Sequence, residues 1–276
     1  ISTGSDEDEA NAICDSIKTE IKINKGAFKD FAVLYRTNAQ SRMLEQTMMR
    51  EGLPYNIVGG TKFYDRKEVK DVLAYLTLVC NPNDNIALKR IINFPVRGIG
   101  EKSIKIFNDL GLEKGISLFD SLKSCRDIKL RGKQQDSIEN FYLSINKFHD
   151  LLDTLDCKEL LRTLLEEFNI ENYYKNNPAE QDRYNNIQEL KLSIDRFAEK
   201  SNGSLKEFLQ EISLYTDLDD WDDKKNSVTL MTIHGSKGLE FSTVFVTGLE
   251  QGLFPLIRMD DDIDQLEEER RLFYVA

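Results

Sequence analysis

Residues 228–254 carry the side chains whose types and spacing most clearly indicate chemistry. An apolar, β-branched run at 228–233 is followed by the polar loop His234-Gly235-Ser236-Lys237-Gly238, and a second apolar run occupies 243–247. Two such runs predict buried strands, and open α/β sheets bind ligands at loops that follow the carboxyl ends of parallel strands. The imidazole and ammonium of this loop could reach a phosphate backbone, and Gly238 would permit its close approach. On spacing alone, an ordinary connecting loop explains the pattern equally well.

A second polar segment, YRTNAQSR at 35–42, follows the apolar run at 31–35. The guanidinium of Arg36 and the amide of Asn38 would leave the end of a strand, where both groups can contact a phosphodiester or a base edge. The alternative is a helix-entry turn in which Asn38 caps the helix and Arg36 is solvated. The residue chemistry alone favours this alternative.

The segment GGTKFYDRKEVKD at 59–71 combines paired glycines, Lys62 and two aromatic residues at the predicted exit from a sheet. Aromatic faces can stack on bases, and a lysine can meet a phosphate. Phe63 and Tyr64 fit equally well as core residues at a domain junction.

The segment NFPVRGIGEKS at 93–103 contains a Gly-x-Gly turn before a helix that is expected to begin near Lys102. Such a turn presents backbone N–H groups and the helix dipole to a phosphate. A glycine-rich turn between two helices is the alternative. The segment lies in a basic region, because residues 86–133 contain eleven Lys and Arg against five Asp and Glu.

The overall composition sets limits on the class of protein. The 276 residues carry a net charge of −11, with 40% hydrophobic and 31% charged residues, which predicts a globular protein of roughly two domains. An acidic chain can still bind phosphate through a local basic region, with a strong dependence on salt. No apolar run is long enough for a membrane span.

Several kinds of site are excluded by the residues present. No G-x-x-x-x-G-K-[ST] occurs, since Glu101 separates Gly100 from Lys102, so the chain cannot cradle nucleotide phosphates by itself. The two histidines lie far apart and give neither a metal site nor a Ser-His-Asp set. The cysteines form no CxxC pair, which argues against zinc or disulfides and for the reducing cytoplasm; they are Cys14, Cys80, Cys125 and Cys157.

The hydrophobic periodicity predicts how these segments are positioned. A helix through residues 10–21, a strand at 31–35, a helix through 43–48 and a strand at 55–58 form a β-α-β unit with a parallel sheet. From residue 63 to 222 only helical periodicity is found, and strand patterns return afterwards. The sequence therefore predicts an α/β domain in two segments, 1–62 and 223–276, interrupted by an all-helical domain at 63–222.

The patterns T-x-H-x-x-K-G-L-E-F and V-x-V-x-G-L-E-x-G-x-F-P, read from Thr232 to Pro255, resemble a motif pair of the UvrD/Rep/PcrA-type superfamily 1 DNA helicases. The segments at 35–42, 59–71 and 93–103 and the EEERRLFYVA at the end resemble further motifs of the same family, in the same order. The resemblance covers essentially the whole chain. It implies the carboxyl-terminal half of a helicase: a second RecA-like motor domain of the P-loop NTPase type, without the P-loop, and an inserted helical domain.

The resemblance also implies roles for individual residues. Glu240 would accept a hydrogen bond from the ribose of ATP beside Gly238, whereas the residue chemistry alone allows a carboxylate at a helix start. The implied contacts to single-stranded DNA are Arg36, Asn38, Lys62, His234 and Lys237. The implied contacts to duplex DNA are Arg97, Gly98, Ile99, Gly100, Lys102 and Ser103. No complete catalytic set and no metal ligands are implied within the chain.

The whole protein is expected to be an ATP-dependent helicase that moves 3′ to 5′ on single-stranded DNA and meets single/double-strand junctions. It would use ATP and Mg²⁺ together with a first motor domain that this chain lacks, so both ends of the chain are expected to be cut edges. Arg270 and Arg271 would pair with Glu267–Glu269 or pack against the sheet rather than contact the γ-phosphate. Two alternatives stay open: a DNA-binding module, or a protein-interaction subunit without motor activity.

Overall fold

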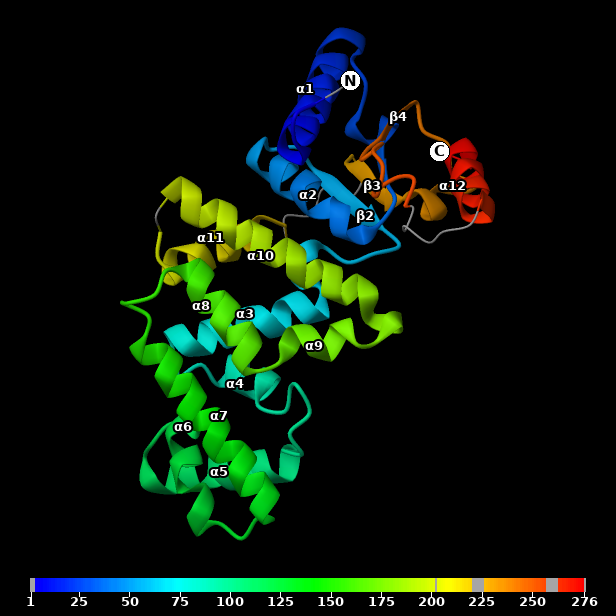
Figure 1. The fold of residues 1–276 in the computed structure, drawn as a ribbon. Coiled ribbons are helices and arrows are strands. Elements are labelled where there is room, and N and C mark those ends of the chain that lie inside the picture. The colour runs from blue at the N-terminus through cyan, green and yellow to red at the C-terminus, as the bar shows by residue number, and fades with distance from the viewer. Residues whose placement is uncertain (1–2, 202, 220–225, 257–262, 276) are drawn as a thin grey trace. The chain divides into compact units, whose positions relative to one another are not determined.

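The computed structural model describes residues 3–201, 203–219, 226–256 and 263–275. By packing, the chain divides into two compact units (Figure 1). The first unit comprises Ile1–Arg66 together with Leu214–Ala276, and the second comprises Lys67–Ser213.

The first unit is built on a four-stranded sheet with the strand order β2-β3-β1-β4. The strands are β1 (Phe31–Tyr35), β2 (Tyr55–Val58), β3 (Val228–Thr232) and β4 (Thr243–Val246). Every neighbouring pair is parallel; Leu34 is paired with Met231 on one side and Val246 on the other. This parallel α/β sheet confirms the fold class that the sequence predicts.

The central strand β1 is buried on both faces, which explains its unbroken apolar sequence. Because successive side chains alternate between the faces, Phe31, Val33 and Tyr35 pack on one side, and Ala32 and Leu34 pack on the other. The first face is covered by α1 (Asp6–Asn24) and α2 (Ser41–Arg50). The second face carries the short 3₁₀ helix η6 (Ile233–Ser236) and α12 (Ile263–Val275).

Local signals in the sequence fix the ends of α1. The Oγ of Ser5 accepts a hydrogen bond from the Asp8 N–H at 3.1 Å, and four acidic residues occupy the first turn, where the helix dipole favours negative charge. The helix ends at Asn24, and the C-cap residue Lys25 adopts a left-handed conformation with φ 52°. Three short 3₁₀ segments complete this unit: η1 (Phe28–Asp30), η2 (Asn38–Gln40) and η3 (Phe63–Asp65).

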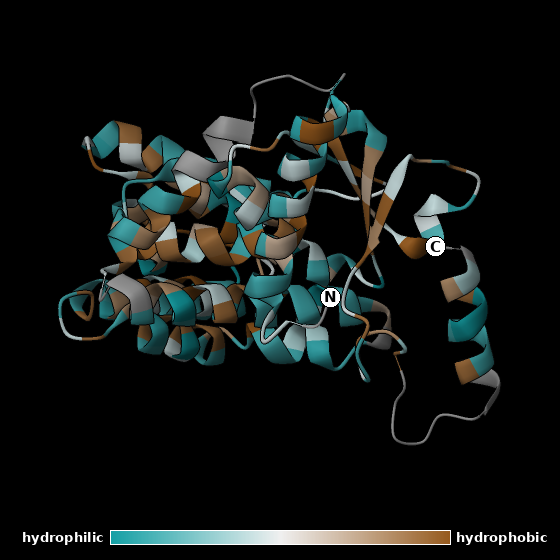
Figure 2. Ribbon diagram, turned by 90° about the horizontal axis from the view of Figure 1, so that it is seen from above, coloured by the Kyte–Doolittle hydropathy of each residue, from teal (hydrophilic) through white to brown (hydrophobic). Residues whose placement is uncertain are grey.

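Where the structure describes the second unit, all of its secondary-structure elements are helices. Its elements are α3 (Lys67–Cys80), α4 (Asn85–Ile91), α5 (Glu101–Lys114), α6 (Leu118–Ser121), η4 (Leu122–Asp127), α7 (Gly132–Asp150), α8 (Cys157–Glu167), α9 (Ile170–Lys175), η5 (Pro178–Glu180), α10 (Gln181–Ser201) and the first part of α11 (Leu205–Asp219). Hydrophobic and hydrophilic residues alternate around these helices (Figure 2). Apolar residues at helical spacing are buried, among them Phe141 and Phe148 on α7 and Leu161 and Leu164 on α8.

The two divisions between the units fall at Arg66/Lys67 and Ser213/Leu214. Residues 63–66 are bound to α2 of the first unit, because the Phe63 N–H donates to Glu45 Oε2 at 2.9 Å and Arg66 Nη2 donates to Ser41 Oγ at 2.8 Å. Residues 220–222, at the end of the predicted helical domain, lie outside the described residues. The functional domain bounds 1–62, 63–222 and 223–276 stay predictions. Within the described ranges, no helix is both long enough and apolar enough to cross a bilayer.

Candidate nucleic-acid interface

The carboxyl ends of three adjacent strands carry the residues predicted to contact single-stranded DNA. Because β2, β3 and β1 are parallel neighbours, the loops that follow them leave the same edge of the sheet. Arg36 and Asn38 follow β1, Lys62 follows β2, and His234 lies in the η6 turn directly after β3. The fold thus brings together segments that are separated by up to about two hundred residues in the sequence.

Arg36 forms a side-on ion pair with Glu269 of α12. Its Nε donates to Glu269 Oε1 and Oε2 at 2.9 and 3.1 Å, and its Nη2 donates to Oε1 at 2.8 Å. Glu269 is only 7% exposed and also accepts the Leu256 N–H at 3.1 Å. Such a planar, charge-assisted fork fixes the orientation of the guanidinium. Nη1 forms no hydrogen bond to any residue that the structure describes.

The sequence gives no local signal for the partner of Arg36, since 233 residues separate it from Glu269. The expected pairing of the final arginines with Glu267–Glu269 is found for Arg270, whose Nη2 lies 2.6 Å from Glu267 Oε2. Glu269 pairs with Arg36 instead.

Asn38 begins the η2 turn but does not cap it. Thr37 is the N-cap residue, and its N–H donates to Gln40 Oε1 at 2.8 Å. The amide of Asn38 lies beside Gly60, where an added Cβ would be 3.4 Å from Asn38 Oδ1 and 3.2 Å from Ile57 Cγ2. Gly60 therefore gives the Asn38 side chain room at the end of β2, and the loops after β1 and β2 meet there.

Lys62 is positioned by the anchoring of the next residue, Phe63, and by the ring of Tyr55. The Phe63 N–H is bound to the buried carboxylate of Glu45, and the Lys62 Nζ lies 5.5 Å from the centre of the Tyr55 ring. Phe63 is fully buried and Tyr64 is 5% exposed, so both are core residues. The alternative in which their faces stack on bases is not supported, and Lys62 is left as the contact candidate in this segment.

In the loop after β3, the exposed His234 lies between two buried residues, and the exposed Lys237 follows the second of them. Ile233 and Ser236 are buried, and Ser236 Oγ donates to the Ile233 carbonyl at 2.8 Å. The Thr232 Oγ1 accepts the Gly235 N–H at 3.2 Å. Gly238 then adopts φ +86°, a conformation that strains any residue with a Cβ. The tight turn thus directs the imidazole and the ammonium away from the core.

Glu240 lies on a different part of the sheet from these residues. Since β3 and β4 are both parallel to β1, the chain after η6 must return toward the amino ends of the strands before β4 begins at Thr243. Phe241 anchors this return segment on the face of the sheet formed by Leu34 and Met231. Glu240 is exposed and no helix begins there, so the helix-start alternative for this carboxylate is not found.

In the second unit, the turn at Gly98–Gly100 is shaped by a residue that the sequence patterns did not single out. Asn93 Oδ1 accepts both the Arg97 N–H at 2.9 Å and the Ile99 N–H at 3.0 Å. Gly98 has φ +74°, and Gly100 is the N-cap of α5 without a side-chain cap bond. An Asn four residues before an Arg-Gly turn is the sequence signal that could have indicated this arrangement.

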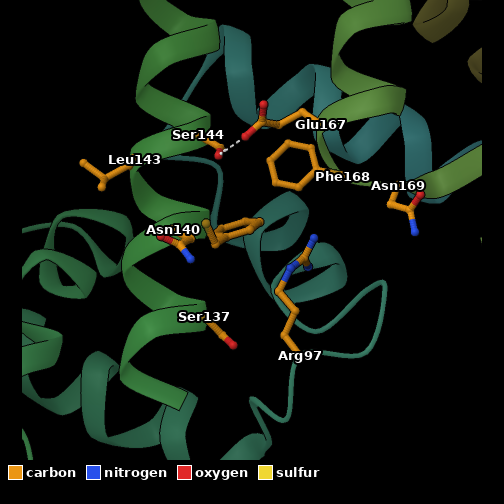
Figure 3. A pocket seen from close by; sticks show the side chains of 9 residues that line it. Arg97, Ser137, Asn140, Leu143, Ser144, Glu167, Phe168 and Asn169 are labelled. Atoms are coloured by element: carbon orange, nitrogen blue, oxygen red, sulfur yellow. Dashed lines mark hydrogen bonds between the residues drawn. The ribbon is translucent and has the colours of Figure 1, made fainter. Parts of the chain in front are cut away.

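The guanidinium of Arg97 is directed into the second unit rather than toward solvent (Figure 3). Its Nη1 donates to the carbonyls of Ile91, Ile92 and Phe94 at 2.9, 3.3 and 2.6 Å, and its Nη2 donates to Tyr75 Oη at 2.6 Å. It also lies between 5.1 and 5.9 Å from the ring centres of Phe141, Phe168 and Tyr75. Burial raises the pKa of Tyr75 to about 12.

These contacts give Arg97 a structural role that the sequence did not predict. The other predicted duplex contacts differ in exposure. Ile99 is 1% exposed and Ser103 is 7% exposed, whereas Gly98, Gly100 and Lys102 are exposed. Lys102 is therefore the side chain, and the two glycines the backbone positions, that this turn presents to solvent.

A cavity of about 450 Å³ lies next to Arg97 on the surface of the second unit. Phe141 and Phe168 line it together with polar residues, among them Ser144, whose Oγ donates to Glu167 Oε1 at 2.7 Å (Figure 3). Among the described residues, no cluster of three His, Cys, Asp or Glu could hold a metal ion. The four cysteines are free thiols, and burial raises the pKa of Cys14 to about 11.

The strands of this parallel sheet come from two segments of the sequence, separated by a long helical segment, and polar loops follow their carboxyl ends. This arrangement is that of a RecA-like domain of the helicase class. The chain belongs to the UvrD-like helicase C-terminal domain family, whose model matches residues 1–276. The resemblance inferred from the motifs is thereby confirmed.

Three relatives illustrate the similarity. The ATP-dependent DNA helicase PcrA of Bacillus subtilis (strain 168) is 41% identical over 261 residues, which cover 91% of this chain and 35% of that protein. The PcrA of Staphylococcus aureus (strain Mu50) is 40% identical over 284 residues, with 98% and 38% covered. The PcrA of Staphylococcus epidermidis is 40% identical over 277 residues, again with 98% and 38% covered. The chain thus spans little more than a third of the length of these relatives.

Proposed function

We propose that this chain supplies the second RecA-like motor domain and the inserted helical domain of an ATP-dependent DNA helicase that translocates 3′ to 5′. Family membership and the relatives described as ATP-dependent DNA helicases support this proposal. The observation that carries it is the arrangement of the sheet, in which three adjacent strands direct polar loops to one edge.

The edge of the sheet would form part of the single-stranded DNA track. Lys62 and Lys237 would meet phosphates, while His234 and Asn38 would donate hydrogen bonds to the backbone or to base edges. Arg36 would contact a phosphate through Nη1, because Glu269 holds its other face and leaves that nitrogen without a described partner. Glu269 would then act as a positioning residue for Arg36.

ATP would lie against the return segment between β3 and β4. Glu240 would accept a hydrogen bond from the ribose, and Gly238 would let the backbone approach the nucleotide. The phosphates and Mg²⁺ would be held by a P-loop domain of the helicase, because this sequence contains no P-loop. The chain therefore supplies one wall of the nucleotide cleft and no complete catalytic set.

The Gly98–Ser103 turn would contact duplex DNA at a single/double-strand junction. Lys102 would bind a phosphate, and the backbone N–H groups near Gly98 and Gly100 would face the same strand. Ile99 and Ser103 would anchor the turn, and Arg97 would hold it in place from inside. The free cysteines fit a reducing cytoplasmic location.

Fluorescence anisotropy of the chain on single-stranded DNA, on a duplex and on a 3′-tailed duplex, at two salt concentrations, tests the proposal. We expect the tightest binding on the tailed duplex and a steep loss of affinity with salt. The variant K62A/K237A should bind single-stranded DNA more weakly than K22A/K29A, which removes the same charge from exposed lysines elsewhere in the first unit. Equal affinities of the two variants would contradict the assignment of the DNA track.

A further inference from the structure

The segment 129–133, at the amino end of α7, carries three exposed cations that form no ion pair with a described residue: Lys129, Arg131 and Lys133. The carboxylates nearest to them along α7 are already bound by another arginine. Arg126 Nη2 lies 2.9 Å from Asp136 Oδ1 and also binds Glu139 Oε2. The positive charge of the segment is therefore not neutralised by its own helix.

This segment is fixed beside the Gly98–Gly100 turn by hydrogen bonds. Gln134 Nε2 donates to the Gly98 carbonyl at 2.6 Å, which joins the first turn of α7 to the glycine turn. Gln135 Nε2 donates to the carbonyl of Ile128 at 3.0 Å and to that of Cys125 at 3.2 Å. These contacts connect the start of α7, on one side of the three cations, to Cys125 and Ile128 on the other side.

The Gln134–Gly98 hydrogen bond joins the segment to the turn that leads into α5, and both elements carry exposed cations. Lys102 and Lys105 of α5 are also exposed and without a described ion pair, so five cations are available. Glu101, Asp109 and Asp127 are the carboxylates close to them in sequence, which leaves an excess of positive charge. A polyanion with regularly spaced charges fits such a surface better than a single small anion, and duplex DNA carries a charge about every 1.7 Å along its axis.

We propose that residues 129–133 are a second phosphate-binding element, which contacts the same duplex as the Gly98–Ser103 turn. This inference rests on the proposed function, because it assumes that the glycine turn meets duplex DNA. Lys129, Arg131 and Lys133 bind phosphates, and Gln134 is the positioning residue that sets their place relative to the turn. The duplex is thereby contacted from two helix ends rather than from one.

Salt-dependent anisotropy with a blunt duplex tests this element. The variant K129A/R131A/K133A is compared with K158A/R162A/K206A, which removes the same charge from exposed positions on α8 and α11. A third variant, K102A/K105A, tests the contribution of α5 beside the glycine turn. Circular dichroism and thermal unfolding of each variant confirm that it is folded before binding is measured.

We expect the 129–133 variant to weaken duplex binding at least tenfold more than its control does. The slope of log K against log salt should become shallower by up to about 2.7, since each lost phosphate contact on B-DNA removes about 0.9. A loss equal to that of the control variant, while K102A/K105A still weakens binding, would overturn the second element and leave the proposed function intact. Equal losses on single-stranded and duplex DNA would overturn it too. Absence of duplex binding by the unmodified chain would refute both proposals.

Discussion

The guanidinium of Arg36, at the end of β1, is held side-on by the carboxylate of Glu269 in α12 through three hydrogen bonds of 2.8 to 3.1 Å. The same carboxylate accepts the Leu256 N–H, so one acidic side chain joins the end of a central strand, the segment after β4 and a helix from the end of the chain. The orientation of the Arg36 guanidinium at the carboxyl end of β1 is therefore set by Glu269 of α12.

Replacement of Glu269 should change the affinity for single-stranded DNA through two effects of opposite sign. The variant E269Q removes a negative charge near the proposed track, and electrostatics alone would tighten binding to single-stranded DNA. If Glu269 positions Arg36, the loss of the charge-assisted fork instead weakens binding, by about 1 kcal/mol or roughly fivefold. Anisotropy with a single-stranded oligonucleotide at low salt measures the sign directly.

The control for this prediction is E267Q, which removes the same charge two residues earlier on α12, from a half-buried carboxylate that pairs with Arg270 rather than with Arg36. It should leave the affinity unchanged or raise it slightly. Tighter binding by E269Q would show that Glu269 does not support a DNA contact of Arg36.

The Arg36–Glu269 pair should also contribute to the stability of the first unit. Glu269 is 7% exposed, so removal of Arg36 leaves a mostly buried carboxylate without its partner. We expect R36A to lower the free energy of unfolding by about 2 kcal/mol, and the double variant R36A/E269A to lower it by less than the sum of the single variants. Urea denaturation of the four proteins gives the coupling energy. Strict additivity would mean that the pair contributes nothing to stability.

The parts of the fold that follow local rules could be predicted from the sequence. The continuous apolar run of β1 indicates a strand buried on both faces, and the helical spacing of residues such as Ile138, Phe141 and Ile145 indicates the buried face of α7. Once the strands are known to be parallel, their following loops must share one edge. Arg36 and His234 each follow such a strand, so a parallel sheet places both on loops at one edge.

The parts that depend on distant packing could not be predicted. Arg97 stands next to a glycine turn in a basic region, which suggests an exposed phosphate contact. The structure instead directs its guanidinium to Tyr75 of α3 and to two phenylalanines from α7 and the end of α8. The carbonyl and aromatic partners of Arg97 come from separate helices, so the sequence contains no periodic pattern that indicates them. The same holds for Glu269, the partner of Arg36, which lies far away in the sequence.

The thiol of Cys14 provides a pH-dependent test of the packing of α1. Burial raises its pKa from the ordinary value of 9.0 to about 11, so the folded state favours the protonated thiol. A raised pKa contributes stability that is present below pH 9 and is lost as the pH rises toward 11. We expect the stability of the unmodified chain to fall more steeply across this interval than that of C14A. Chemical denaturation at several pH values measures the difference, and parallel curves would contradict the burial of this thiol.

The chain by itself should hydrolyse no ATP. Glu240 and Gly238 can form at most one wall of a nucleotide site, and without a P-loop the phosphates are not held in line with an attacking water. A coupled ATPase assay with saturating single-stranded DNA should therefore give no rate above the buffer background. Turnover that persists through a second purification step and is abolished by E240A would show that the chain contains a complete nucleotide site.

At the glycine turn, the effect of a residue on stability can be measured separately from its effect on DNA binding. Arg97 makes four hydrogen bonds and lies over three aromatic rings, so R97K keeps the charge but loses the planar fork, and we expect the second unit to lose about 2–3 kcal/mol of stability. Lys102 is exposed and without a described partner, so K102A should leave stability within about 0.5 kcal/mol while weakening duplex binding. Urea denaturation and duplex anisotropy on both variants measure the two effects. The reverse result, a stable R97K that no longer binds duplex, would show that the guanidinium of Arg97 leaves its internal partners to bind DNA directly.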